Sequence, residues 1–118
     1  MGLLNFMQKS ALRKFARDDL SHAMKLPGYL QTQVADEVFK NFRDFMGDEP
    51  DAAQWQFKYQ LIRHQRNNYG RNGPQSFQDP TWLTYALTED ITGAVLRDDK
   101  EIVMACLAWV DENRSKQS

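Results

Sequence analysis

The sequence predicts an all-α fold, a compact single-domain bundle of five or six helices that occupies residues 1–118. Apolar residues recur every three or four positions along most of the chain, which is the spacing of one helix face. Residues that typically start and stop helices flank these segments. A chain of 118 residues with 42% hydrophobic and 26% charged side chains can bury a real core without disulfides and is ordinary for a globular domain.

The first predicted helix ends before Pro27. Its apolar residues share one face and its basic residues share the opposite one; the two sets are Leu4, Met7, Ala11, Leu12 and Phe15, and Lys9, Arg13 and Arg17. The apolar stripe then moves to the side that had been basic, at Leu20 and Met24. Asp18 and Asp19 lie at this change, and either can cap a new helix. We therefore expect a kink or break there, which would give six helices.

Three later helices are predicted from apolar spacing together with end signals. They cover residues 34–46 with Gly47 as the stop, residues 81–96 with Asp79 and Pro80 as the start, and residues 100–113 with Asp98 or Asp99 as the cap. The last of them is apolar around most of its circumference and is expected to be the most buried. The tail at 114–118 is expected to fray.

Residues 53–62 support two interpretations. Apolar and polar residues alternate from Trp55 to Leu61, as in a strand. Trp55 and Ile62 also share one helical face, and Pro50 suits a helix start. The sequence offers no second strand as a partner, and a lone strand leaves its backbone groups unpaired. Helix is favoured, whereas a strand at 53–62 would have to pair across a homodimer.

The segment 63–78 is polar, with three arginines and no acid, and it predicts a loop. Arg, Tyr and Trp are enriched at binding hot spots, so this loop and the tryptophan after it are the predicted contact surface of a small regulatory or adaptor protein. The partner is another protein or a second copy. The predicted contact residues are Arg63, Arg66, Tyr69, Arg71 and Trp82. A structural role, in which Trp82 pins the loop to the core, explains the pattern equally well.

The charge is nearly balanced overall but uneven along the chain. Fifteen basic and sixteen acidic residues give a net charge of −1, so no global field attracts DNA or a membrane. Residues 1–17 hold four bases and no acid, and residues 78–118 hold four bases and eight acids. This asymmetry predicts pairing of the two ends, within or between chains. A second candidate patch comprises Lys9, Arg13 and Arg17. The alternative function is RNA or DNA binding through the Arg63–Arg71 loop and this basic face.

The residues needed for catalysis or metal binding are sparse. The histidines are His22 and His64, and the single cysteine, Cys106, lies in an apolar run. A structural zinc site takes about four Cys or His ligands. We therefore expect no enzymatic activity, metal, cofactor or small-molecule substrate. One cysteine and no signal peptide favour the cytoplasm, and the longest apolar run, nine residues, is too short to span a membrane.

Overall fold

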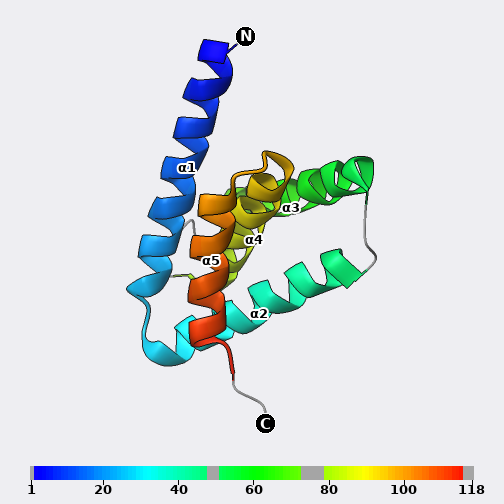
Figure 1. Ribbon diagram of the computed structural model, residues 1–118. Helices are drawn as coiled ribbons and strands as arrows, with labels where there is room; N and C mark the ends of the chain where they lie inside the picture. Colours follow the sequence, from blue (N-terminus) through cyan, green and yellow to red (C-terminus); the bar gives the residue numbers. More distant parts are fainter. Residues whose placement is uncertain (1, 48–50, 73–78, 116–118) are drawn as a thin grey trace.

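In the computed structural model the described residues form five α-helices, which confirms the all-α prediction (Figure 1). The structure describes residues 2–47, 51–72 and 79–115, with the side chains of 2–9 and 70–72 left out of that description. The helices are α1 (Gly2–Met24), α2 (Gly28–Gly47), α3 (Ala52–Asn72), α4 (Pro80–Leu96) and α5 (Lys100–Asn113).

α4 lies at the centre of the bundle and contacts each of the other four helices. Leu83, Leu87 and Ile91 are buried along it, and more residues are buried in α4 than in α5. The prediction that the helix at residues 100–113 is the most buried is therefore wrong, because α4 is enclosed by the other helices. Thr88 and Thr92 are also buried, and each hydroxyl donates to the carbonyl oxygen four residues earlier at 2.7 Å. α4 therefore offers the other helices a packing surface on several sides without leaving these hydroxyls unpaired.

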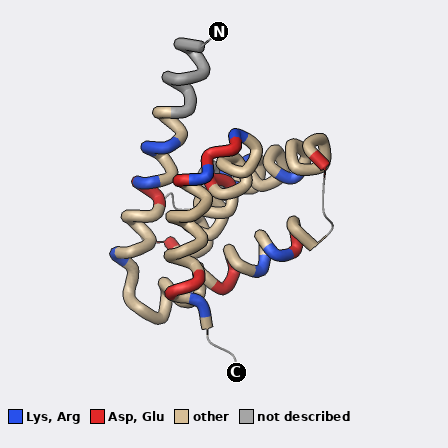
Figure 2. Tube along the Cα trace, in the orientation of Figure 1, with Lys and Arg blue, Asp and Glu red and all other residues tan. Residues whose placement is uncertain are grey.

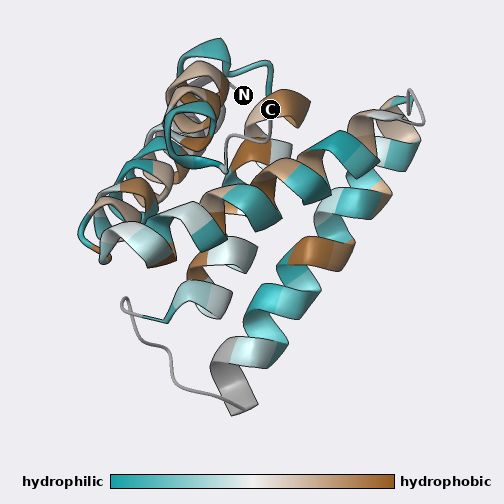
Figure 3. Cartoon of the chain, turned by 90° about the horizontal axis from the view of Figure 1, so that it is seen from below, coloured by the Kyte–Doolittle hydropathy of each residue, from teal (hydrophilic) through white to brown (hydrophobic). Residues whose placement is uncertain are grey.

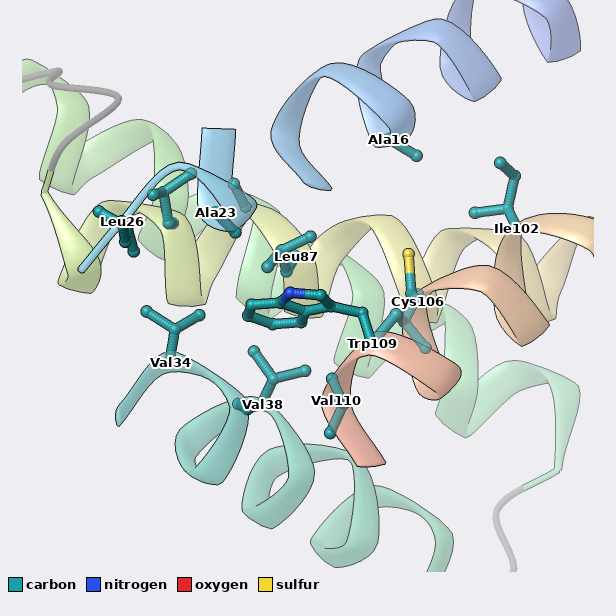
Figure 4. Close-up of a cluster of buried hydrophobic side chains, with 14 of the residues drawn as sticks. Ala16, Ala23, Leu26, Val34, Val38, Leu87, Ile102, Cys106, Trp109 and Val110 are labelled. Atoms are coloured by element: carbon teal, nitrogen blue, oxygen red, sulfur yellow. The ribbon is translucent and has the colours of Figure 1, made fainter. Parts of the chain in front are cut away.

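Trp109 of α5 lies in the middle of the apolar core (Figure 4). Val34 and Val38 of α2 lie on one side of its ring, and Leu87 of α4 lies on another. The residue is only 6% exposed, but its Nε1 has no hydrogen-bond partner among the described residues. An unpaired buried N–H costs on the order of 1–3 kcal/mol. The apolar area of the ring outweighs that cost.

The helix ends follow the predicted capping residues. Asp79 caps α4, because its Oδ1 accepts a hydrogen bond of 2.9 Å from the backbone N–H of Thr81, and Pro80 occupies the first helical position. Asp99 caps α5 and accepts from the backbone N–H of Ile102. α2 ends at Gly47, as the sequence predicted.

α1 is one unbroken helix, so the predicted break at Asp18 and Asp19 is wrong. Asp19 is 4% exposed, and its carboxylate accepts a hydrogen bond from Arg66 rather than capping a helix. The predicted apolar stripe does not face the core at its described side chains, because Ala11 is exposed and Phe15 is 56% exposed; the side chains of Leu4 and Met7 lie outside the described part of the chain. The second stripe is divided, since Leu20 packs against the core and Met24 is 58% exposed. The N-terminal end of α1 extends past the other helices (Figure 1).

α3 includes much of the segment that was predicted to be a loop. The helix continues to Asn72, so that prediction is wrong for residues 63–72, and residues 73–78 lie outside the described part of the chain. Arg costs a helix little by intrinsic propensity, whereas Asn is a poorer helix former. Contacts of Arg66 and Tyr69 with neighbouring elements stabilise these turns, which local composition does not show.

Residues 53–62 are helical, which confirms the favoured interpretation over the strand. Trp55 and Ile62 are buried, at 8% and 3% exposure. α3 approaches α4 most closely at Gly93, where a Cβ atom would lie 2.9 Å from Cε1 of Tyr59. Glycine leaves that space free, so a residue that weakens a helix by propensity here permits tight helix packing.

The start of the C-terminal tail is held against α2. The guanidinium of Arg114 lies 4.5 Å from the centroid of the Phe39 ring. The backbone N–H and the hydroxyl of Ser115 donate to the Asp36 carboxylate, each at 2.6 Å. Residues 114 and 115 follow the end of α5 and contact α2, and residues 116–118 lie outside the described part of the chain.

Candidate functional site

A groove of about 380 Å³ lies between α1 and α3, with α4 as its floor. Its α1 wall is apolar and consists of Leu12 and Phe15. The α3 wall and the floor are mainly polar, with residues Tyr59, Arg63, Arg66, Asn67, Glu89, Asp90 and Arg97. The groove exists because α1 and α3 both pack mainly on α4. We call it the α1–α3 groove.

A second cleft, of about 510 Å³, is lined by residues of α2, α3 and α4. Amide and hydroxyl groups dominate its lining, and Glu37 is its one charged lining residue among those described. Its described lining holds no lysine or arginine, whereas the α1–α3 groove combines arginines with the exposed Phe15 and is therefore the stronger candidate site.

Arg66 binds three carboxylates at the base of the α1–α3 groove. Its guanidinium nitrogens lie 2.7 Å from Glu89 Oε2, 3.2 Å from Asp19 Oδ2 and 3.7 Å from Asp90 Oδ1. The guanidinium also lies over the ring of Trp82, 4.8 Å from a ring centroid. The three carboxylate side chains are 13% exposed or less. Buried charges need partners, so this cluster constrains how α1 and α3 dock on α4.

Asp90 has a carboxylate oxygen without a donor. Its Oδ2 is buried and has no hydrogen-bond partner among the described residues. Burial raises the pKa of Asp90 well above its ordinary value, and a hydrogen bond with Asp19 and the negative charge of Asp19 raise it further. The positive charge of Arg66 opposes these effects without cancelling them. Asp90 therefore holds a proton more readily than an ordinary aspartate does.

Asp90→Asn is expected to be more stable than the wild type at about pH 8, with a difference that shrinks towards about pH 4. The pKa of Asp90 is higher in the folded state than in the unfolded state, so protonated Asp90 favours the folded state. This contribution to stability is complete below the unfolded pKa and is lost as pH rises through the folded pKa. Asparagine stays neutral throughout. Urea unfolding at both pH values measures the difference, with Asp44→Asn at an exposed position of α2 as the control. A difference that grows on acidification would contradict the raised pKa.

Two other arginines, Arg63 and Arg97, line the groove. Neither Arg63 nor Arg97 forms an ion pair with another described residue, and Nε of Arg97 is buried with no hydrogen-bond partner among those residues. Arg63 is exposed, and Phe15 on the opposite wall is 56% exposed. The three carboxylates at the base of the groove surround Arg66, whereas Arg63 presents an exposed guanidinium on the α3 wall. This exposed positive charge favours an anionic group in the groove.

The predicted contact residues of the former loop lie in different environments. Tyr69 donates from its hydroxyl to Asp79 Oδ2 at 2.8 Å and thereby joins the end of α3 to the start of α4. Trp82 is 9% exposed, and its ring lies under the guanidinium of Arg66, so it packs within the protein. The side chain of Arg71 lies outside the described part of the chain. Of the four that are described, Arg63 is the one exposed on the groove.

The second basic patch is paired with the start of α5. Arg13 donates to both carboxylate oxygens of Asp99, at 2.8 and 3.2 Å, and Arg17 pairs with Glu101. Figure 2 shows these basic positions of α1 beside acidic ones. Burial alone would raise the pKa of Asp99, but its hydrogen bonds and the nearby positive charges hold it below the ordinary value. The predicted pairing of the two ends therefore occurs within the chain; the Lys9 side chain lies outside the described part.

His64 and Cys106, which were considered for catalysis, do not line the α1–α3 groove. His64 is exposed on α3 and forms a hydrogen bond of 2.9 Å with Asn68. Burial raises the pKa of the Cys106 thiol to about 12, so it stays protonated at neutral pH. Among the described residues, no group of three or more His, Cys, Asp or Glu is placed to hold a metal ion. No described helix is long and apolar enough to cross a membrane.

The sequence analysis did not predict the three buried carboxylates of the site, Asp19, Glu89 and Asp90. One signal is available: Glu89 and Asp90 are adjacent acids inside an otherwise apolar helix, where a charge is rarely buried unless it is paired. Asp19 gives no such signal, because capping explains it equally well.

No protein-family model, curated protein or solved structure matches this chain.

Proposed function

We propose that this chain is a small non-enzymatic regulatory or adaptor protein that binds another protein through the α1–α3 groove. The observation that carries the proposal is the exposed Phe15 opposite Arg63, which forms no ion pair with another described residue. Interfaces are enriched in aromatic residues and arginine. We also propose a cytoplasmic location, because a reducing compartment keeps the single cysteine, Cys106, as a thiol.

The groove favours a partner segment that carries an acidic side chain next to apolar ones. Arg63 and Arg97 offer guanidinium groups, which bind carboxylates with two parallel hydrogen bonds. Leu12 and Phe15 offer apolar contact on the opposite wall. An amphipathic helix of the partner presents both kinds of side chain on one face. A basic segment would meet the positive charge of the groove and bind less well.

Nucleic-acid binding has weaker support than protein binding. Of the arginines proposed to contact phosphate, Arg66 is enclosed by carboxylates, and Arg13 and Arg17 are paired with α5. A phosphate that approached the groove would also meet Glu89 on its floor. A domain dedicated to nucleic acid usually presents far more unpaired basic charge.

Capture from nuclease-treated native lysate tests the proposed function. Tagged wild-type protein is expected to retain a defined protein at low and at high salt. Arg63→Glu and Phe15→Ser are each expected to lower the affinity for that protein at least about tenfold. Both positions are exposed, so the fold is expected to survive the substitutions.

Lys40→Glu is the matched control, because it makes the same charge change at an exposed position of α2. It is expected to retain the captured protein as the wild type does. Undiminished capture by both groove variants would show that the partner binds elsewhere. Loss of the captured proteins on nuclease treatment would instead support the alternative of RNA or DNA binding.

A further inference from the structure

The outer face of α3 is exposed and almost free of charge. Between residues 52 and 68, Arg63 is the one exposed Lys, Arg, Asp or Glu, and it borders the groove. Lys58 donates to the carbonyl oxygen of Phe45, and Arg66 binds the buried carboxylates. Figure 2 shows most of α3 as uncharged, and Figure 3 colours most of it as hydrophilic. The outer face is therefore polar without being ionic.

Two large apolar side chains lie in the middle of this face. Phe57 is 64% exposed, and Leu61, one helical turn later, is 48% exposed. Amide side chains surround them, including the exposed Gln60, and Asn68 is hydrogen-bonded to His64. We call this surface, from Ala53 to Asn68, the α3 outer face.

The exposed positions of α2 differ sharply, since they include Glu37, Lys40, Arg43 and Asp44. Charges of both signs are usual on a solvated helix face. The buried centres of protein interfaces, by contrast, are depleted in charge and enriched in aromatic residues. The α3 outer face resembles an interface centre more than a solvated surface.

We infer that the α3 outer face binds the same face of a second copy of this chain. A two-fold symmetric interface places one surface patch against itself, so any excess charge on the patch would meet like charge. A patch without charges avoids that repulsion. Its amide side chains each carry both donors and acceptors, so they can pair with the same amide side chains of the second copy. The α3 outer face is thus complementary to itself.

If the two α3 helices pair antiparallel, the two-fold axis passes through the midpoint of the α3 outer face. The α3 outer face runs from residue 53 to residue 68, and its midpoint falls between residues 60 and 61. Leu61 then lies beside Leu61 of the second copy, and Phe57 lies against His64 of the second copy. A single helix pair makes a small interface, so dissociation constants in the micromolar range are expected.

Sedimentation equilibrium from about 10 to 300 µM tests this inference. The average mass of the wild type is expected to rise from 13.8 kDa towards twice that value. Leu61→Glu and Leu61→Lys are each expected to stay monomeric, because each places like charges at the axis. An equimolar mixture of the two variants is expected to regain the dimer, since opposite charges then meet.

Met104→Glu is the matched control, because residue 104 is 70% exposed on α5, and it is expected to dimerise like the wild type. Circular dichroism checks that all variants stay helical. Phe15→Ser is expected to dimerise as well, which separates this surface from the α1–α3 groove. Wild-type protein that stays at 13.8 kDa throughout, or Leu61→Glu protein that still dimerises, would overturn the inference.

Discussion

Arg66→Met is expected to lower the free energy of unfolding by about 3–5 kcal/mol at neutral pH. The substitution leaves Asp19, Glu89 and Asp90 buried around an apolar side chain instead of a guanidinium. Methionine is flexible and fills much of the same space, so the loss reports mainly the unpaired charges. Acid protonates the carboxyls and removes their repulsion, so the loss is expected to diminish on acidification. Urea unfolding at neutral and acid pH measures both effects.

Arg63→Met is the control for this prediction. It makes the same substitution three residues earlier on the same helix, at an exposed position without an ion pair among the described residues. Its free energy of unfolding is expected to stay within about 0.5 kcal/mol of the wild type. Equal losses for the two variants, or an Arg66→Met loss that is independent of pH, would show that the buried charges are not its cause.

Trp109→Ala is expected to cost about 3–5 kcal/mol of unfolding free energy. The ring lies among side chains of α2 and α4, and alanine would leave a cavity between helices that do not otherwise fill it. The loss of packing in the centre of the core is expected to weaken the docking of α5. Thermal and urea unfolding both measure the change.

Trp109→Phe separates ring packing from hydrogen bonding. Phenylalanine keeps an aromatic ring and removes the Nε1–H, which is buried without a partner among the described residues. Relief of that unpaired donor offsets the smaller ring, so a cost below about 1.5 kcal/mol is expected. A loss as large as that of Trp109→Ala would indicate that Nε1 has a partner that the described residues do not include.

Sequence signals predicted the helix ends better than the buried helix faces. The caps at Asp79 and Asp99 depend on a few neighbouring residues, so local sequence contains the information. The buried face of α1 depends on α4 and α5, which lie far along the chain. Neither predicted stripe became the buried face: the bundle buries the small residues Ala16 and Ala23, which allow close helix approach, and it leaves Phe15 and Met24 at the surface.

The candidate site shows the same division between local and distant information. Composition singled out both Arg63 and Arg66 but could not distinguish them. The structure places Arg66 against carboxylates 47 positions earlier and 23 positions later, and it leaves Arg63 exposed. Such pairing decides whether an arginine stabilises the fold or faces a partner. Distant contacts also explain why the loop prediction was wrong, because the contacts of Arg66 and Tyr69 stabilise the end of α3.

The central position of α4 has a consequence for synthesis. α1, α2 and α3 all pack on α4, so the first three helices leave the ribosome before the helix that unites them. Their apolar faces remain without a partner until residue 96 has emerged. Chaperones and aggregation compete with folding during that interval. The chain is therefore expected to gain most of its tertiary contacts only after α4 has emerged.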